Sequence, residues 1–327
     1  MGNIDFVITW VDGNDPKWLA DKAQYVSNDQ SAKKDVAGKA RYQDNGLLRY
    51  WFRGVEKFAP WVRKIFFVTY GHLPAWLDTS NPKLVIVNHK DYLDDSLLPT
   101  FSSVPLNLNL HRIPGLSEQF VYFNDDMFLV SPCKETLFFR KGLPCDMAVQ
   151  DVLPATEMSA YWYMVYNDII CLNRHYKKRA SIKKYWKKWF APIYGKNLIK
   201  NILLSPLACF TGIYETHLPA GYLKSAFEEA WNKEEKLAEV STHKVRTSSD
   251  ISENFVRYLQ LATGRFVPIN KLKKGRYCSM GASNITDYIL SGKYKYLCIN
   301  DEVEGEAFQK TENAFQALLP NKSAFEK

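Results

Sequence analysis

Three short apolar runs in this chain end in acidic or amide residues, and this feature most constrains the fold. The runs are Ile4–Trp10, followed by Asp12; Phe120–Phe123, followed by Asn124, Asp125 and Asp126; and Tyr294–Ile299, followed by Asn300 and Asp301. In open α/β sheets ligands bind beyond the carboxyl ends of the strands, where carboxylates can hold hard cations such as Mg²⁺. Taken alone, Asn124–Asp126 fits a solvated turn better, because Asn and Asp are common turn formers.

The order of the predicted elements favours an α/β fold with a largely parallel sheet and helices on its faces. Further strands are predicted at Lys64–Thr69 and Leu84–Asn88. Helices are predicted from Asp44 or Asn45 to Phe58, from Ser102 or Ser103 toward Arg112, and over Gly221–Leu237, Ile251–Leu261 and Glu304–Leu319. Residues 19–43 are polar and lysine-rich and form a predicted excursion. Such a sheet would bring the strand-end acids to one edge.

A basic helical segment interrupts this pattern at residues 151–215. Residues 169–214 contain ten Lys or Arg and no Asp or Glu, so the net charge of +8 leaves 8 − 10 = −2 for the rest. Within it, Ile182, Trp186, Trp189 and Ile193 have helical spacing, with lysines between them. This pattern fits a helix in a membrane interface and a helix that packs its Trp residues into the core equally well. Residues 176–200 are the predicted contact with an anionic membrane.

Several common kinds of site lack their sequence signals. The chain has no glycine-rich phosphate loop, no G-x-G-x-x-G after the first run and no G-x-S-x-G, and its six cysteines show no C-x-x-C spacing. P-loop, dinucleotide, serine-hydrolase and structural-zinc sites are therefore not supported. Acids, histidines and arginines remain, a set that suits phosphate transfer, in which cations neutralise phosphoryl oxygens and a histidine removes a proton. No secretory signal is visible before Ile4, so a cytoplasmic location is expected.

Four ordered blocks resemble the Stealth family, which includes bacterial capsular polysaccharide phosphotransferases and the catalytic subunit of the lysosomal-enzyme N-acetylglucosamine phosphotransferase. The first block is Ile4–Pro16. The second includes Arg41–Asn45, Arg49-Tyr50, Ala59–Arg63, Leu98–Ser103, His111-Arg112 and Asn124–Asp126. The third contains His217-Leu-Pro and Thr242–Arg246, and the fourth is Cys298–Asp301 with the helix after it. The resemblance thus reaches both ends of the chain but not residues 169–214.

The resemblance implies transfer of a hexose-1-phosphate, N-acetylhexosamine-1-phosphate above all, from a UDP-sugar to a hydroxyl of a glycan. The acceptor would be a glycan or a lipid-linked glycan of a capsule or cell surface. The acceptor oxygen would attack the β-phosphorus, and UMP would leave. The implied fold is Rossmann-like and glycosyltransferase-A-like, and no nucleic-acid partner is expected.

The resemblance also implies roles for individual residues. Mg²⁺ or Mn²⁺ would be held by Asp125, Asp126 and Asp301. Catalysis would involve His217, Arg246, Asp126 and His111, with His217 favoured as general base. The nucleotide-sugar would be bound by Thr9, Trp10, Asp12, Gly13, Arg49, Arg112 and His243, the arginines acting as phosphate clamps. Residues 1–150 would form the nucleotide-sugar part, 151–215 a basic insertion for acceptor or membrane contact, and 216–327 the rest of the catalytic domain.

Two other functions compete with this one. A conventional metal-dependent glycosyltransferase also uses strand-end acids, but it releases UDP and leaves both phosphates on the nucleotide. A non-catalytic protein built around residues 169–214 would bind an anionic polymer or a membrane and turn nothing over. The basic segment also allows a peripheral position on the inner face of the cell membrane.

Overall fold

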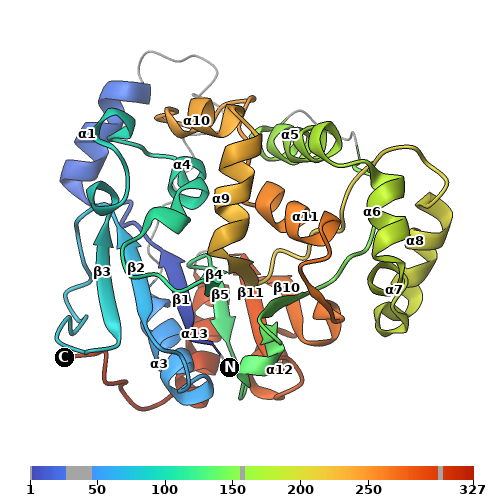
Figure 1. Ribbon diagram of the computed structural model, residues 1–327. Helices are drawn as coiled ribbons and strands as arrows, with labels where there is room; N and C mark the ends of the chain where they lie inside the picture. The colour runs from blue at the N-terminus through green and yellow to red at the C-terminus, as the bar shows by residue number, and fades with distance from the viewer. Residues whose placement is uncertain (1, 27–45, 155–158, 301–304) are drawn as a thin grey trace.

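A computed structural model describes residues 2–26, 46–154, 159–300 and 305–327 of the chain. Its centre is a five-stranded sheet in the order β3-β2-β1-β4-β8, in which the first four strands are parallel and β8 is antiparallel to β4. The strands are β1 (Ile4–Thr9), β2 (Ile65–Thr69), β3 (Leu84–Asn88), β4 (Gln119–Phe123), β5 (Met127–Leu129), β6 (Phe139–Arg140), β7 (Leu143–Asp146), β8 (Ala220–Leu223), β9 (Val267–Pro268), β10 (Gly275–Ser279) and β11 (Tyr296–Asn300). The predicted α/β class with a mostly parallel sheet is confirmed (Figure 1).

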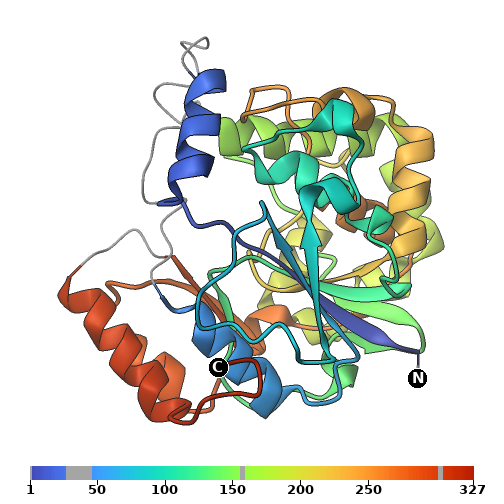
Figure 2. The same ribbon diagram turned by 90° about the vertical axis from the view of Figure 1, so that its left-hand side faces the viewer.

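Helices lie on both sides of this sheet (Figure 2). The α-helices are α1 (Pro16–Val26), α3 (Leu48–Phe58), α4 (Ser103–Leu108), α5 (Ala160–His175), α6 (Lys178–Lys184), α7 (Trp186–Trp189), α8 (Leu198–Leu204), α9 (Lys224–Lys233), α10 (Lys236–Ser241), α11 (Asn254–Ala262), α12 (Ile285–Leu290) and α13 (Glu306–Leu318). The short 3₁₀ helices are His89–Asp91, Asp95–Leu97, Leu110–Arg112, Glu135–Leu137, Pro192–Asn197 and Lys271–Lys273. Among the described residues, no helix combines the length and the apolar character needed to cross a membrane.

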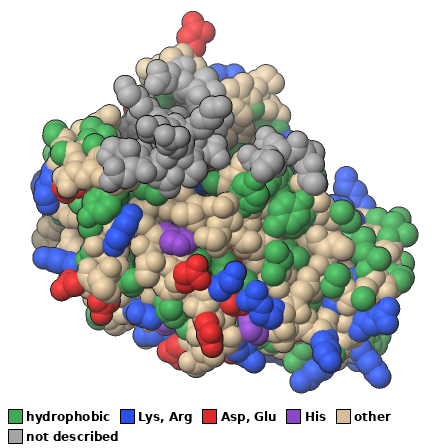
Figure 3. Space-filling view, turned by 90° about the horizontal axis from the view of Figure 1, so that it is seen from above, with side chains coloured by type: hydrophobic (Ala, Val, Ile, Leu, Met, Phe, Trp, Pro, Cys, Tyr) green, Lys and Arg blue, Asp and Glu red, His purple; other side chains and the backbone are tan. Residues whose placement is uncertain are grey.

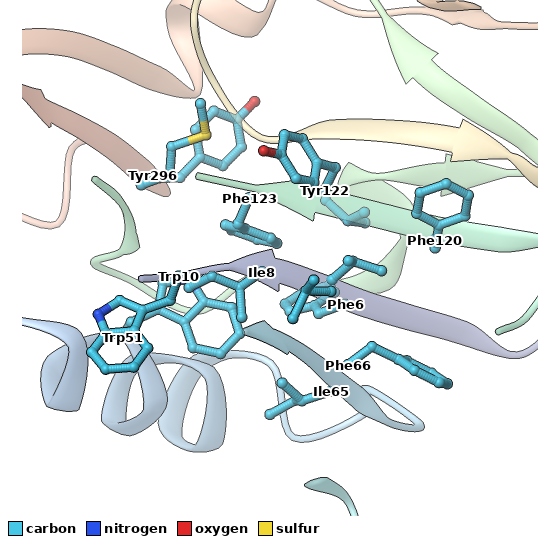
Figure 4. Packing of buried hydrophobic residues seen from close by; sticks show 14 of the residues in the cluster. Phe6, Ile8, Trp10, Trp51, Ile65, Phe66, Phe120, Tyr122, Phe123 and Tyr296 are labelled. Atoms are coloured by element: carbon cyan, nitrogen blue, oxygen red, sulfur yellow. The ribbon is translucent and has the colours of Figure 1, made fainter. Parts of the chain in front are cut away.

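Strand β4 is buried on both faces because its side chains alternate between two helical layers. The Phe123 ring contacts Trp51 of α3, with 5.6 Å between the ring centroids, whereas the Phe120 ring contacts Phe227 of α9 at 5.7 Å. Figure 4 shows Phe6 and Phe123 with Trp51 on the side that α3 covers. These two layers hold β4 rigidly, so the turn that follows Phe123 starts from a fixed point.

Two predicted elements differ from the structure. Gly221–Leu223 belong to strand β8 rather than to a helix, and a Cβ on Gly221 would lie 3.2 Å from Phe139 and Pro144, so glycine lets β8 approach its neighbours closely. Residues 16–26 are helical although an excursion was predicted from residue 19. The Asp15 carboxylate accepts from Trp18 N at 2.7 Å, a helix start at the Asp-Pro pair. The predicted caps Asp44 and Asn45 lie outside the described residues.

The third acid-ended run enters a separate small sheet with the order β10-β11-β5. Strand β11 pairs with β5, which begins directly after Asp126, and Ile299 N donates to the Asp126 carbonyl at 2.8 Å. The second sheet therefore brings the end of β11 to the carboxyl end of β4. Asp301 itself lies outside the described residues.

The basic segment is helical, but it does not form one continuous helix of either kind that the spacing allowed, interfacial or packed into the core. The chain leaves helical geometry at Tyr185 (φ −116°, ψ 29°), which separates α6 from α7. Trp189 is fully buried and its ring stacks on Phe210, with 5.5 Å between centroids, whereas Trp186 is 56% exposed. The two tryptophans thus have different environments, and Trp189 cannot contact a membrane.

Candidate active site

Asp126, in the turn after β4, is the centre of the candidate site. Its Oδ2 accepts from the Cys298 Sγ at 3.1 Å and lies 3.7 Å from His217 Nε2. Its Oδ1 is buried and has no hydrogen-bond partner among the described residues. A buried carboxylate oxygen without a donor is costly. Asp126 is therefore held by protein contacts on one oxygen and left available on the other.

Cys298 closes one side of this site from strand β11. Burial raises the pKa of its thiol well above the ordinary value, and the neighbouring Asp126 carboxylate raises it further. The thiol consequently stays protonated and donates to the carboxylate. It is a neutral neighbour of Asp126 rather than a thiolate.

His217 reaches Asp126 from a strained loop. Its φ is 47°, a left-handed conformation that residues other than glycine adopt uncommonly and that often occurs at functional sites. Burial lowers the pKa of His217, but the Asp126 carboxylate and the nearby Glu215 and Glu253 outweigh burial, so the net pKa lies above the usual value. The side chain is 41% exposed. A basic imidazole beside a carboxylate and open to solvent can take a proton from a bound hydroxyl.

A buried charge network fixes the His217 loop. The Glu215 Oε1 accepts from the backbone nitrogens of Thr216 and His217, both at 2.9 Å, and its Oε2 accepts from Arg257 Nη1 at 2.9 Å. Arg257, fully buried in α11, is held in turn by the Asp146 carboxylate, which accepts from Nε at 2.7 Å and from Nη2 at 3.1 Å. This network supports the strained conformation of His217.

Two further residues from the small sheet border His217. The Tyr277 ring meets the His217 ring edge-on, with 5.5 Å between centroids, and the Asn300 amide donates to the Tyr277 hydroxyl at 3.1 Å. Tyr277 is exposed, so an aromatic surface adjoins the imidazole. Strands β10 and β11 thus provide polar and aromatic groups next to Asp126.

A chain of hydroxyl and amide groups links β1 to the same turn. The Thr9 Oγ1 lies 3.1 Å from the Tyr122 hydroxyl, and that hydroxyl donates to the Asn124 Oδ1 at 2.7 Å. Val7 and Tyr122 are paired in register, so Thr9 and Tyr122 lie on one face of the sheet. This chain places Thr9 close to the turn that contains Asp126.

A divalent cation fits this site on the evidence of Asp126. Its orphaned Oδ1 is the kind of hard oxygen ligand that Mg²⁺ and Mn²⁺ take, and the exposed Asp125 adjoins it. Asp126, His217 and Cys298 each offer a ligand atom within 4.8 Å of the others. Thiolate and imidazole suit softer ions such as Zn²⁺. The three donor atoms are therefore compatible with a divalent cation, and the Asp126 carboxylate is the one among them that suits a hard ion.

The first acid-ended run leads to a neighbouring group of residues that includes His72. The backbone nitrogen of Asp12 donates to His72 Nε2 at 2.8 Å, and burial lowers the pKa of His72, which therefore accepts as the neutral form. The Trp10 side chain is buried against Phe67 and His72. Gly13 lies in the turn before α1. Asp12 and Gly13 are accessible, whereas the Trp10 ring belongs to the core.

Of the third family block, residues Thr242–Arg246 lie beside the start of α4. Arg246 Nη2 donates to the Ser103 Oγ at 3.2 Å, and Phe101 N donates to the Lys244 carbonyl at 2.7 Å. His243 Nδ1 lies 2.7 Å from the buried Asp250 carboxylate, which leaves Nε2 as its outer nitrogen. His243 and Arg246 are therefore held firmly on the α4 side of the sheet.

His111 and Arg112 lie near the opposite end of β4. The His111 ring stacks on Phe227 of α9, with 5.6 Å between centroids, and the Arg112 guanidinium lies 4.3 Å from the centre of the Trp231 ring. Helix α9 starts where Lys224 N donates to the carbonyl of Glu118, at the beginning of β4. Burial lowers the pKa of His111 to about 4. The structure thus does not bring His111 to Asp126.

Several residues around the site carry no signal in the sequence, and the prediction for Arg49 stays a prediction. Glu215, Arg257, Asp146 and Tyr277 gave no motif, and His72 had no informative neighbour in sequence. The only usable signal was that Glu215 is two residues before His217. Arg49, predicted as a phosphate clamp, lies 5.7 Å over the ring of Trp76.

Comparison with known proteins gives three findings. Residues 2–30 match the family model described as Stealth protein CR1, conserved region 1, and residues 41–145 match Stealth protein CR2, conserved region 2. Over its whole length the chain is 38% identical to "Capsular polysaccharide phosphotransferase WcwK" of Streptococcus pneumoniae, covering 99% of it, and 37% identical to "Receptor polysaccharide phosphotransferase WefC" of Streptococcus oralis, covering 100% of it. A crystal structure of the galactosyltransferase LgtC with donor and acceptor sugar analogs covers 98% of both chains, at 8% identity and a TM-score of 0.41. That overlap is too loose to relate individual residues.

Proposed function

The chain belongs to the Stealth family, and we propose that it transfers a hexose-1-phosphate from a UDP-sugar to a hydroxyl of a glycan, releasing UMP. Full-length identity of 37–38% to polysaccharide phosphotransferases makes it a phosphotransferase of polysaccharide synthesis. A purely non-catalytic role is thereby set aside. The proposal includes the UDP-sugar donor, UMP as the leaving group and the dependence on a metal ion. It also includes an N-acetylhexosamine as the sugar, a glycan or lipid-linked glycan as the acceptor, and a cytoplasmic location.

One observation carries the proposal, namely the pairing of Asp126 with His217. The carboxylate keeps one oxygen for a cation, while its other oxygen lies 3.7 Å from a histidine whose pKa is raised. Phosphoryl transfer to a hydroxyl needs a neutralised phosphate and a nearby base. Both requirements can be met within one turn and one loop of this chain.

The proposed base is His217. In its neutral form, Nε2 would take the proton from the acceptor hydroxyl as the oxygen forms its bond to the β-phosphorus and the bond to the UMP oxygen breaks. The Asp126 carboxylate would then stabilise the imidazolium. The Glu215 carboxylate keeps the backbone of the loop in place, so the ring need not reorganise during the step.

Asp126 would hold Mg²⁺ or Mn²⁺, with Asp125 as the adjoining carboxylate. When bound, such an ion would supply positive charge to the phosphate oxygens of the donor. Thr9, Asp12 and Gly13 are the proposed nucleotide contacts, since Thr9 ends β1 and the other two follow it at the same end of the sheet. Arg246 and His243 remain proposed phosphate contacts from the α4 side. The Trp10 ring belongs to the core and is given no direct role, whereas the roles of His111, Arg112 and Arg49 stay predictions that this scheme does not use.

Identification of the nucleotide product tests the proposal. The protein is incubated with UDP-N-acetylglucosamine or UDP-N-acetylgalactosamine, Mg²⁺ or Mn²⁺ and a glycan acceptor, and the nucleotides are separated by chromatography. We expect UMP and a product whose mass has increased by the sugar and one phosphate. Release of UDP, with an increase by the sugar alone, would show a conventional glycosyltransferase instead. A reaction without enzyme controls for breakdown of UDP to UMP.

A further inference from the structure

Helix α8 presents an apolar stripe to solvent. Ile199, Ile202 and Leu203 are 59%, 56% and 69% exposed, and their i, i+3, i+4 spacing puts them on one face of the helix. On the inward side Leu198 packs against the core, and the buried Asn201 amide donates to the Ala148 carbonyl at 2.8 Å and accepts from Gln150 N at 2.6 Å. Helix α8 therefore has apolar side chains on its solvent face as well as toward the core.

Three further exposed apolar side chains lie close to α8 in the sequence. Leu207 follows the helix, Ile193 precedes it in the 3₁₀ helix Pro192–Asn197, and Trp186 lies on α7, all three exposed. We call Trp186, Ile193, Ile199, Ile202, Leu203 and Leu207 the α7–α8 surface. Isolated exposed apolar residues are normal, but a set of this kind from one stretch of chain indicates a binding surface.

Basic side chains accompany the α7–α8 surface without acidic ones from the same segment. Arg179, Lys183, Lys184, Lys187 and Lys196 are exposed, and residues 169–214 contain no Asp or Glu. The neighbouring acid outside this segment, Asp151, is paired with Lys200 at 2.8 Å. Figure 3 shows hydrophobic and basic side chains at its right-hand end, the end at which Figure 1 shows α6, α7 and α8, and no acidic side chain there on that face.

We propose that the α7–α8 surface docks on an anionic lipid bilayer, with its apolar side chains in the interface and the lysines against lipid phosphates. A bilayer offers apolar chains directly beneath a layer of negative charge, which matches this combination of side chains. The α7–α8 surface differs from the interfacial helix that was predicted within residues 176–200. Trp189 and Ile182 of that prediction are buried, and most of the exposed apolar area comes from residues 193–207.

Co-sedimentation of the full chain with vesicles tests this inference. We compare phosphatidylglycerol-rich vesicles with pure phosphatidylcholine vesicles, using the wild type and the double variant Ile202→Ser/Leu203→Ser. The wild type should bind the anionic vesicles and release them at high salt. The variant should partition about tenfold more weakly. The matched control, Leu73→Ser/Leu290→Ser, removes exposed leucines elsewhere and should bind as the wild type does.

Two results would overturn the inference. One is equal vesicle binding by the wild type and the Ile202→Ser/Leu203→Ser variant. The other is that the wild type binds no vesicles and elutes as a dimer, whereas the Ile202→Ser/Leu203→Ser variant elutes as a monomer. The α7–α8 surface would then bind a second copy of the chain. Thermal melting checks that the variants fold. If the double variant does not fold, Leu207→Ser and, separately, Lys183→Glu/Lys187→Glu give the same comparison and should each weaken vesicle binding.

Discussion

The two ends of strand β4 place histidines in opposite environments. Near the amino end, His111 lies flat against Phe227, is largely buried and has its pKa lowered to about 4. Beyond the carboxyl end, His217 occupies a strained loop, is partly exposed and has its pKa raised beside Asp126. Both residues lie in motifs that resemble one family, yet their burial and the charges around them differ. His111 suits packing, and His217 suits proton transfer.

The largest effect is expected at the carboxyl end. Asp126→Asn or His217→Gln should lower the transfer rate by about a thousandfold or more, because each removes a group to which the proposal gives a role in the phosphoryl step. Steady-state rates of UMP formation measure this. Asp287→Asn, an acid on α12, is the matched control and should keep nearly full activity. Substantial transfer by a folded Asp126→Asn variant would contradict the role of the carboxylate.

Glu215→Gln should separate positioning from chemistry. The amide can still accept from the nitrogens of Thr216 and His217 but no longer carries charge toward Arg257, so a loss of about tenfold in kcat is expected. Because the Glu215 carboxylate helps raise the pKa of His217, its removal should lower that pKa. The acid limb of the kcat profile, where His217 becomes protonated, should then move to lower pH. An unmoved limb with reduced kcat would indicate a purely structural role for Glu215.

His111 should affect stability rather than catalysis. Its folded pKa of about 4 lies below the value near 6.5 expected in the unfolded chain, so the unfolded state binds more protons between these values. The folded state is therefore destabilised as the pH falls from 6.5 toward 4. His111 should lower the free energy of unfolding over this range by on the order of 2 kcal/mol. Urea unfolding at pH 7 and pH 5 should show a smaller difference for His111→Phe than for the wild type.

The same variant also tests the division between the two ends of β4. If His111 only packs, His111→Phe should retain transfer activity at neutral pH within about threefold, in contrast to His217→Gln. A loss of activity as large as that of His217→Gln, in a His111→Phe variant with a normal melting temperature, would show that His111 takes part in catalysis.

The smallest effect is expected at Cys298. Because a hard ion prefers oxygen ligands, Mg²⁺ does not require the Cys298 sulfur that contacts Asp126, and Cys298→Ala should change Mg²⁺-dependent transfer by less than about threefold. Removal of the buried thiol should cost about 1 kcal/mol of unfolding free energy. Loss of transfer that returns on addition of Zn²⁺ would instead identify Cys298 as a ligand.

The elements that the sequence predicts well are those set by local patterning. Strands β1 to β4 and helix α3 follow from apolar runs and helical spacing, and Leu84–Asn88 matches β3 to the residue. Strand β8 was predicted as part of a helix. Gly221–Leu223 is too short a stretch to show the alternation of side chains that marks a strand. The Asp15–Pro16 pair could have marked the start of α1, but the polar residues after it suggested a loop.

The candidate site is less predictable, because it depends on contacts between distant segments. The contact of Asp126 with His217 and Cys298 joins residues 91 and 172 positions apart, and it requires the second sheet as well as the first. A motif could identify these residue types but not their partners. The buried Arg257, which supports the His217 loop through Glu215, resembles any other helical arginine in the sequence.

Binding of Mn²⁺ measured by electron paramagnetic resonance, with UDP present, tests most directly whether Asp126 is the cation ligand beside His217. The wild type and Cys298→Ala should both bind Mn²⁺, and Asp126→Asn should lose this binding while its fold, checked by circular dichroism, is kept. Unchanged Mn²⁺ affinity in Asp126→Asn would contradict the proposal that this carboxylate holds the cation at the carboxyl end of β4.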